Sequence, residues 1–310
     1  MAEQVSPLIR RVIARNPSKF SYRGTGTYIV GSGRHVVVID PGPDLVTHRD
    51  ALAAALSGHE VVAILVTHCH ADHSPLSAWL RAETGAPTIA FGPHGLIDPD
   101  PEPDEDPDAD APDESEPTLI DGEPVQESKE TIDIDFVPDL AVADGEIAAS
   151  FDGLTMRAIH TPGHTSNHDC FSLDAEHALF SGDHVMGWST TVVSPPDGDM
   201  RAYMESLHKV AGRHDAVIWP THGNPITDVD PFLDAYLEHR VLREAQITDL
   251  VRGGATSISD MVEVLYVDVR RDLHKAARRS VLSHLVKLVD DGVVSIDGDR
   301  ARLSSQFSPG

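Results

Sequence analysis

The chain has 310 residues, which is long enough for one large domain or for a large domain with a small one. Hydrophobic residues make up 40% of the chain and charged residues 24%, as in soluble globular proteins, and no apolar run approaches the roughly 20 residues that a membrane span needs. The formal net charge of -26 argues against a general binder of polyanions, and the presence of only two cysteines excludes a disulfide framework and favours the cytoplasm.

Strands and helices alternate along the first part of the chain. The apolar runs predict strands at 28–30, 36–40, 61–66 and 87–90, with helices at 47–56 and 74–83. Further along, they predict strands at 132–137, 147–151, 154–160, 169–173, 178–180 and 216–219, with a helix at 199–212. This mixture indicates a layered α/β domain.

The acidity is concentrated in one segment. Residues 98–116 contain eleven Asp or Glu, five Pro and no Lys or Arg. They have too few apolar side chains to repay the cost of ordering, so an acidic, proline-rich insertion at about 98–117 is expected. Residues 232–310 are nearly balanced in charge, and this contrast favours two domains, 1–231 and 232–310.

The second of these domains has its own pattern. A long helix from 231 to about 252 is followed by helices at 257–265 and 272–290. Strands at 293–296 and 301–303 then flank Asp297-Gly-Asp299, which is a hairpin signal. A short helix, a longer helix and a β-hairpin are typical of a winged helix, so this part is expected to be a small α+β domain.

Polar side chains of the types that bind metals follow four of the predicted strands. Because loops at one edge of a sheet bring such groups together, we expect a metal site there. Imidazoles and carboxylates suit zinc or a similar divalent ion, and seven groups are too many for one tetrahedral ion but enough for two. The seven residues are His68, His70, Asp72, His73, His164, Asp183 and His222.

The motifs that contain these residues resemble those of the metallo-β-lactamase superfamily. They are Thr67-His-Cys-His-Ala-Asp-His73, Thr161-Pro-Gly-His-Thr165, Ser181-Gly-Asp183 and Thr221-His-Gly223. The resemblance implies an αββα sandwich with two metal ions at one edge. It also implies that the first ion is bound by His68, His70 and His164, the second by Asp72, His73 and His222, and both by Asp183.

The resemblance also implies hydrolysis. Two Zn²⁺ ions, with Mn²⁺ or iron as alternatives, lower the pKa of a shared water, and the resulting bridging hydroxide attacks a carbonyl or phosphorus. Asp72 is expected to orient this hydroxide as a catalytic group. His168 is expected to contact substrate or to donate a proton to the leaving group, with a buried or surface histidine as the alternative. Asp40 and Thr67, at strand ends near the site, are expected to lie directly behind the metal ligands, with plain turn roles as the alternative.

The branch of the superfamily can be narrowed. Asp183 at the bridging position argues against a dedicated β-lactamase. The winged-helix-like tail, together with Asn16-Pro-Ser-Lys-Phe20, Gly24-Thr-Gly-Thr-Tyr28, Asp183-His-Val-Met-Gly-Trp188 and His239-Arg-Val-Leu-Arg-Glu244, is similar to the lactamase-beta-2-like branch. A member of that branch acts as an endoribonuclease on single-stranded RNA.

Three hypotheses about function remain. The favoured one is a zinc-dependent hydrolase of a small-molecule ester, thioester or lactam, because the charge of -26 repels polyanions. The second is a nuclease for single-stranded RNA, with phosphates bound by the basic residues of the helix around 268–290, namely Arg270, Arg271, Lys275, Arg278 and Arg279. The third is a nucleic-acid-binding winged-helix protein with a non-catalytic sandwich. The C-terminal part is expected to cover either the sandwich or a partner subunit. The sequence therefore leaves open whether the protein forms a homo-oligomer.

Overall fold

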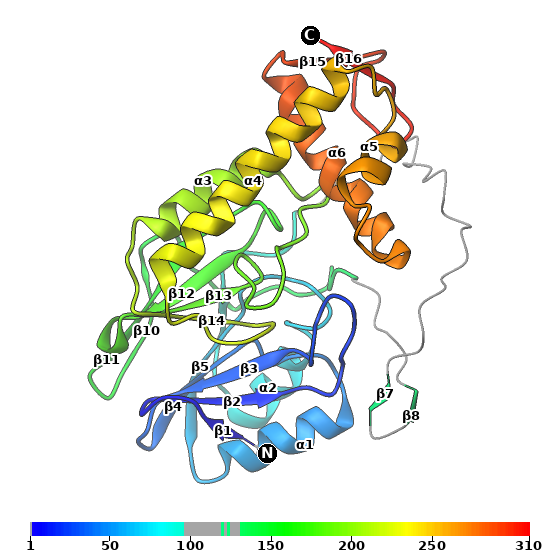
Figure 1. Cartoon of the computed structure of the whole chain (residues 1–310). Coiled ribbons are helices and arrows are strands. Elements are labelled where there is room, and N and C mark those ends of the chain that lie inside the picture. Colours follow the sequence, from blue (N-terminus) through cyan, green and yellow to red (C-terminus); the bar gives the residue numbers. More distant parts are fainter. Residues whose placement is uncertain (1, 96–118, 121–122, 125–130) are drawn as a thin grey trace.

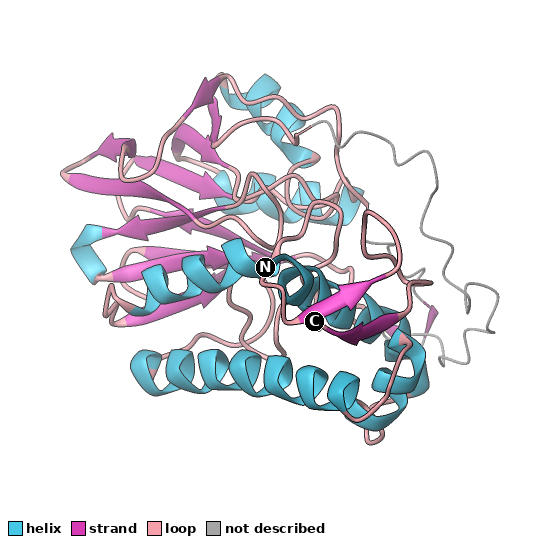
Figure 2. Ribbon diagram, turned by 90° about the horizontal axis from the view of Figure 1, so that it is seen from above, coloured by secondary structure: helices cyan, strands magenta, loops and turns pink. Residues whose placement is uncertain are grey.

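The computed structural model describes residues 2–95, 119–120, 123–124 and 131–310 (Figure 1). The acidic segment predicted at 98–117 lies outside these residues. Two sheets stack face to face, with helices on the outer side of each, and a separate group of helices follows at the C-terminal end (Figures 1 and 2). A short strand pair, β7 (Leu119–Ile120) and β8 (Glu123–Pro124), belongs to neither sheet.

The first sheet has seven strands, in the order β1-β2-β3-β4-β5-β6-β9. In chain order they are β1 (Glu3–Gln4), β2 (Ile9–Ile13), β3 (Gly26–Val30), β4 (His35–Ile39), β5 (Glu60–Leu65), β6 (Thr88–Ala90) and β9 (Leu140–Ala141). Two helices cover its outer face, α1 (Val46–Leu56) and α2 (Leu76–Thr84). The strands β4, β5 and β6 run parallel, so the polar loops that follow them lie at one edge.

The second sheet has five strands, in the order β10-β11-β12-β13-β14. They are β10 (Ile147–Phe151), β11 (Leu154–His160), β12 (Asp169–Leu173), β13 (Ala178–Gly182) and β14 (Val217–Pro220), and the 3-10 turn η1 (Asp174–Glu176) joins β12 to β13. Helices α3 (Met200–Ala211) and α4 (Val229–Arg252) cover its outer face. Because β11 and β13 are both antiparallel to β12, and β14 is parallel to β13, the strands β11, β13 and β14 end at the same edge.

Alternation along the strands explains the four layers. In β4, Val37 and Ile39 face the core between the sheets, whereas Val36 and Val38 face α1 and α2. Strand β13 shows the same division, because Phe180 faces the other sheet and Leu179 packs with α3 and α4. Strands buried on both faces read as continuous apolar runs, which is why the sequence identified them. The predicted αββα sandwich is confirmed.

The C-terminal domain contains α5 (Ile258–Leu265), the 3-10 turn η2 (Arg271–Leu273), α6 (His274–Asp290) and the strand pair β15 (Val294–Ile296) and β16 (Phe307–Pro309). The hairpin differs from the prediction, because the partner of β15 is residues 307–309 and not 301–303. Ala301 and Leu303 are apolar because they are buried in the core of this domain as part of a loop.

Other elements also differ from the sequence prediction, among them the short strands β1 and β9, which were not expected. No strand forms at 132–137, where Ile132 makes a single bridge to His70 while Ile134 and Val137 are exposed. Conversely, β2 was not expected, since Arg10 and Arg11 interrupt its apolar pattern. Arg10 reaches across to α1, where it donates a hydrogen bond to the carbonyl oxygen of Ala55 at 2.7 Å.

Helix α4 belongs to both domains. Its first half, including Leu233 and Tyr236, packs in the core outside the second sheet, and its last turns, including Ile247 and Val251, pack in the C-terminal core. The predicted division between residues 231 and 232 therefore falls within this shared helix. Ion pairs add a second connection: Glu244 of α4 contacts Lys287 of α6 at 2.9 Å.

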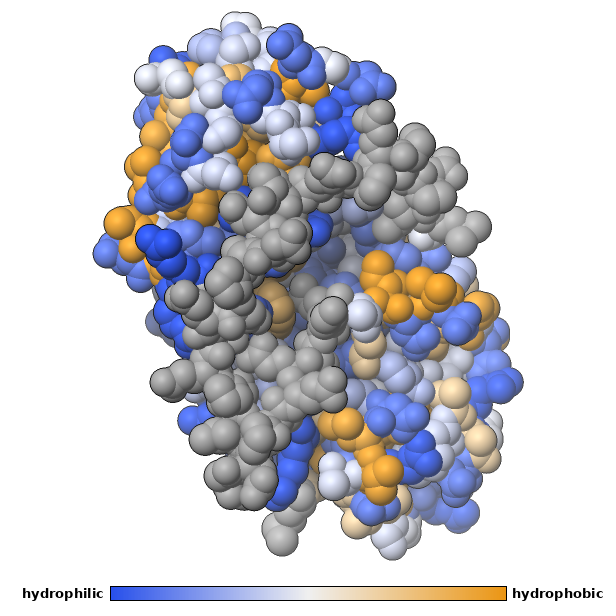
Figure 3. Space-filling model, turned by 90° about the vertical axis from the view of Figure 1, so that its right-hand side faces the viewer, coloured by the Kyte–Doolittle hydropathy of each residue, from blue (hydrophilic) through white to orange (hydrophobic). Residues whose placement is uncertain are grey.

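The surface mixes hydrophilic and hydrophobic residues. On the side seen in Figure 3, hydrophobic residues form separated patches between larger hydrophilic areas. Within the described part of the chain, none of the helices has the length and apolar character needed to cross a membrane.

Replacing His284 with leucine tests how this buried residue limits stability in acid. Burial between α4 and α6 lowers the pKa of His284 to about 4, so the folded protein binds a proton there less readily than the unfolded chain does. Its contribution to stability is present above the unfolded pKa near 6.5 and falls as the pH decreases. From pH 7 to pH 5, the wild type should lose about 2 kcal/mol more unfolding free energy than H284L, measured by chemical denaturation.

The matched control is His208→Leu, because the His208 side chain is exposed on α3. This variant should retain the acid sensitivity of the wild type. Equal sensitivity in H284L and the wild type would contradict the assignment.

Candidate metal centre

Four loops at one edge of the sandwich bring the seven predicted ligands together. His68, His70, Asp72 and His73 follow β5, and His164 follows β11. Asp183 follows β13 directly, and His222 comes two residues after β14. Since these strands end at the same edge of the sandwich, residues far apart in the sequence become neighbours.

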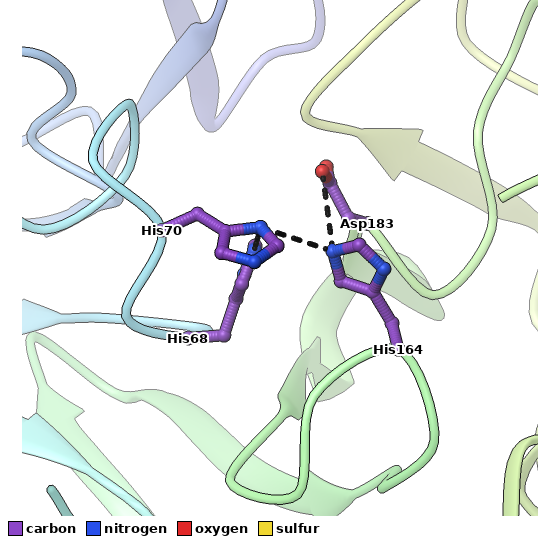
Figure 4. A group of neighbouring side chains, drawn as sticks. All are labelled: His68, His70, His164 and Asp183. Atoms are coloured by element: carbon purple, nitrogen blue, oxygen red, sulfur yellow. Dashed lines mark hydrogen bonds and ion pairs between the residues drawn. The ribbon is translucent and has the colours of Figure 1, made fainter. Parts of the chain in front are cut away.

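The first group of donor atoms comprises His68, His70, His164 and Asp183, whose ligand atoms all lie within 4.8 Å of one another (Figure 4). The Nδ1 atom of His70 is 2.9 Å from His68 Nε2 and 3.2 Å from His164 Nε2. The carboxylate of Asp183 approaches His164 Nε2 to 3.8 Å.

The second group comprises Asp72, His73 and His222, again with ligand atoms within 4.8 Å of one another. Asp72 lies 3.3 Å from His222 Nε2 and 3.6 Å from His73 Nε2. Asp183 also reaches this group, with its Oδ2 atom 3.6 Å from His73 Nε2 and its Oδ1 atom 3.5 Å from His222 Nε2. Asp183 therefore lies between the two groups.

Hydrogen bonds on the far side of the rings fix their orientation. His73 Nδ1 donates to Asp40 Oδ2 at 2.9 Å, and His164 Nδ1 donates to the carbonyl oxygen of Val192 at 2.7 Å. His68 Nδ1 lies 3.1 Å from Thr67 Oγ1, which itself donates to Asp40. This network assigns the protons to Nδ1, so the Nε2 lone pairs of these rings point into the site.

The donor set fits cations. With Nδ1 protonated, His68 and His164 both present bare Nε2 lone pairs toward His70 Nδ1, which carries at most one proton and so cannot fully satisfy both. The Nε2 atom of His73 and the Oδ1 atom of Asp183 are buried and have no hydrogen-bond partner. Nitrogen and carboxylate ligands suit zinc and similar divalent ions, and two groups that share Asp183 suit a pair of ions.

Electrostatics supports the same conclusion. Burial, together with the neighbouring His164, lowers the pKa of His70 to about 3, which keeps the ring in the neutral form that binds metals. Burial also lowers the pKa of His222, but the carboxylates of Asp183 and Asp72 outweigh it and raise this pKa to about 10. The two carboxylates thus create a strong demand for positive charge in the site.

Asp40 accepts hydrogen bonds from several residues behind the candidate ligands. Its carboxylate accepts hydrogen bonds from the backbone N–H of Thr67 at 2.8 Å, from Thr67 Oγ1 at 2.8 Å and from His73 Nδ1 at 2.9 Å. A fourth, from Thr221 Oγ1 at 3.3 Å, connects the loop that carries His222. The structure thus places Asp40 and Thr67 directly against His73 and His68.

Thr25 is a neighbour of the site that the sequence reasoning missed. Its Oγ1 donates to Asp72 Oδ2 at 2.6 Å, and Asn16 holds Thr25 through both its side-chain oxygen and its side-chain nitrogen at 2.9 Å. Both residues occur in the motifs that resemble the lactamase-beta-2-like branch, which was the only signal for them.

His168 lies deeper than expected. Its side chain is fully buried, and it is not among the residues that line the cavity next to the ligands. Its Nδ1 atom lies 2.9 Å from Thr161 Oγ1, and its Nε2 atom accepts a hydrogen bond from the backbone N–H of Asp183 at 3.2 Å. This position does not fit the predicted contact with substrate; it fits a residue that holds Asp183 in place.

A cavity of about 330 Å³ opens onto the two groups of ligands. Asp72, His164, Asp183 and His222 form its floor. Loops of the sandwich and the start of α6 form its walls, so both domains enclose it. We call it the metal cavity.

Family comparisons agree with this geometry. Residues 23–222 match the family model described as the metallo-beta-lactamase superfamily. The chain belongs to the metallo-beta-lactamase superfamily. Residues 257–302 match the beta-lactamase associated winged helix domain, so the small C-terminal domain is a winged helix. Both parts of the sequence resemblance are confirmed.

Similar proteins span almost the whole chain. An atrochrysone carboxyl ACP thioesterase of Aspergillus chevalieri is 30% identical over 95% of this chain and 85% of its own length. A beta-lactamase-like protein 2 homolog of Caenorhabditis elegans is 30% identical over 94% and 88%. The solved structure of a beta-lactamase domain protein from Burkholderia ambifaria superposes with a TM-score of 0.75 and 20% identity, covering 100% of this chain and 94% of that one, which shows the shared fold.

Replacing Asp40 with asparagine should weaken metal binding. The amide cannot accept the hydrogen bonds from Thr67 and His73 with the same charge, so His73 loses its fixed orientation. Metal affinity should fall by about 10- to 100-fold, measured by metal content after dialysis against a chelator. Asp174→Asn, which changes a half-exposed carboxylate paired with Arg157, should keep the wild-type affinity. Equal metal content in D40N and the wild type would exclude this role.

The position of His168 gives a second prediction. His168→Phe removes the acceptor for the Asp183 N–H, whereas His168→Gln keeps a polar atom near the place of Nε2. Metal affinity should therefore decrease in H168F and recover, in part, in H168Q. A group that only protonates the leaving group would leave metal content unchanged in both variants, so that result would restore the original prediction.

Proposed function

We propose that this protein is a dinuclear metal-dependent hydrolase of thioesters. The observation that carries the proposal is the metal cavity, a largely apolar space whose floor is formed by four of the seven candidate metal ligands. His68, His70, His164 and Asp183 would hold one ion, and Asp72, His73 and His222 the other, with Asp183 shared. When bound, two divalent ions of the zinc type would supply a water of lowered pKa and an electrophile for the substrate carbonyl.

Asp72 is the group of the chain that would guide the attacking water. Its side chain is partly exposed on the floor of the metal cavity, and Thr25 fixes one of its oxygens. A hydrogen bond from the attacking water to this carboxylate would orient the water toward the carbonyl carbon. Addition of water and loss of the carbon–sulfur bond yields a carboxylate, a proton and a thiol.

The chemistry of the leaving group favours a thioester. Among the described residues that line the metal cavity, the metal-ligand candidates are the only His, Asp or Glu, and the remaining titratable donors are Lys19 and Tyr266, which are weak acids. A thiolate leaves without prior protonation because thiols are much stronger acids than alcohols or amines. The relative from Aspergillus chevalieri, named as a thioesterase, supports the same choice over an ester or a lactam.

The nuclease alternative has less support. Arg278 is only 7% exposed, so it is not available to a phosphate on the surface. Arg270, Lys275 and Arg278 each have an interaction partner already. The formal net charge of -26 disfavours approach of RNA as well. A single-stranded RNA substrate, and a winged helix that binds nucleic acid without catalysis, are outcomes of the test below.

The cysteines bear on the predicted location of the protein. Both cysteines, Cys69 and Cys170, are free and buried, which supports the predicted cytoplasmic location.

The decisive comparison is between the wild type and Asp72→Asn, both with measured metal content. With a benzoyl thioester of N-acetylcysteamine, the wild type should release thiol, and D72N should reduce kcat by at least about 100-fold. Asp174→Asn should behave as the wild type, since it lies at a surface ion pair. The reaction is followed with a thiol reagent.

Labelled single-stranded RNA is tested in parallel. RNA cleavage by the wild type that is lost in D72N, without thioester cleavage, would make the protein a nuclease. Metal-loaded wild type that cleaves neither substrate would contradict the proposed hydrolase and favour the non-catalytic alternative.

A further inference from the structure

The metal cavity has two apolar walls that come from different domains. The sandwich contributes Phe20 from the loop after β2, and Met186 and Trp188 from the loop after β13. The winged-helix domain contributes a set that we call the roof, which consists of Tyr266, Val269, Leu273 and Ala276. The metal-binding floor is therefore faced by apolar side chains on both sides.

The aromatic rings in these walls are held in place. Trp188 stacks on Tyr22, with ring centroids 5.3 Å apart and planes 18° from parallel. The guanidinium of Arg23 lies over the Tyr22 ring, 5.3 Å from its centroid. In the roof, the guanidinium of Arg243 lies 4.3 Å from the ring centre of Tyr266 and donates a hydrogen bond to the carbonyl oxygen of Leu265 at 3.1 Å. Such fixed rings present flat surfaces without a further entropy cost on binding.

We propose that the roof selects thioesters whose acyl group is an aromatic ring system. Flat rings pack against Phe20, Trp188 and Tyr266 by stacking or edge contacts, which adds to the gain from burying apolar area. A cavity of about 330 Å³ admits more than a two-carbon acyl group, and a small acyl group would leave these walls wet. This inference rests on the proposed thioesterase function and makes the winged helix a part of the substrate site.

Four thioesters of N-acetylcysteamine test the acyl preference of the metal-loaded protein: acetyl, octanoyl, benzoyl and 2-naphthoyl. The value of kcat/KM should be at least about ten-fold higher for 2-naphthoyl than for acetyl, because the larger group fills the apolar space. It should also exceed the value for octanoyl, which matches the ring surfaces less well. A higher value for octanoyl, or equal values across the series, would overturn the preference for rings while the thioesterase function stands.

Two substitutions in the roof test its role. Ala276→Phe places a ring in the cavity and should lower kcat/KM for 2-naphthoyl at least about ten-fold more than for acetyl. Tyr266→Leu keeps an apolar side chain but removes the ring, so it should reduce the preference for 2-naphthoyl over octanoyl. The matched control is Ala235→Phe, which adds the same ring at an exposed position of α4 outside the metal cavity and should keep the wild-type values.

Binding of the free acid 2-naphthoate, measured by calorimetry, separates this inference from the proposed function. The acid should bind to the wild type and to A235F, and at least about ten-fold more weakly to A276F, whereas acetate should bind equally to all three. Binding that depends on the roof without thioester cleavage would retain the aromatic site and reject the thioesterase. Binding of 2-naphthoate that is unchanged in A276F would overturn the role of the roof. No binding and no cleavage would overturn both proposals.

Discussion

The arrangement of the site depends on the need to neutralise donor atoms that are buried together. Seven His and Asp side chains turn their lone pairs toward one small volume at the edge of the sandwich. Water is largely excluded there, so the repulsion between these atoms is weakly screened. The raised pKa of His222 expresses the same need, because its ring would take up a proton where no other positive charge is present. Cations bound by these groups would satisfy that need.

The sandwich supplies the rigid support that such a site requires. Each ligand follows the end of a strand, and most of these strands are packed on both faces. The ligands are then fixed from behind, by a carboxylate at His73 and by a backbone carbonyl at His164. Asp40, which accepts the hydrogen bond from His73, has a positive φ of 48°. A non-glycine residue adopts this backbone conformation at some cost in free energy. Local strain and a buried network are therefore combined at one residue behind the site.

The sequence identified the side chains that gather at the candidate site because strand ends followed by His and Asp have no explanation in packing. The sandwich and most of its strands were predictable for a related reason, since strands buried on both faces form apolar runs. The burial of His168 behind the candidate ligands was not predictable. His168 is four residues from His164, and this spacing does not show whether its side chain faces the cavity or the interior. Thr25 and the roof also escaped prediction, because their roles depend on contacts between distant segments. The partner of β15 could not be inferred, because buried loop residues such as Leu303 resemble a strand.

The shared helix α4 has a thermodynamic consequence. Tyr236 and Arg240 of this helix hydrogen-bond to Thr191, next to Val192, whose carbonyl oxygen orients the ligand His164. The same helix continues into the core of the winged helix. Detaching the winged helix would expose the apolar face of α4 and loosen the segment that orients a ligand. Metal binding at the candidate site would therefore be linked to the docking of the C-terminal domain, and each would favour the other by the same free energy.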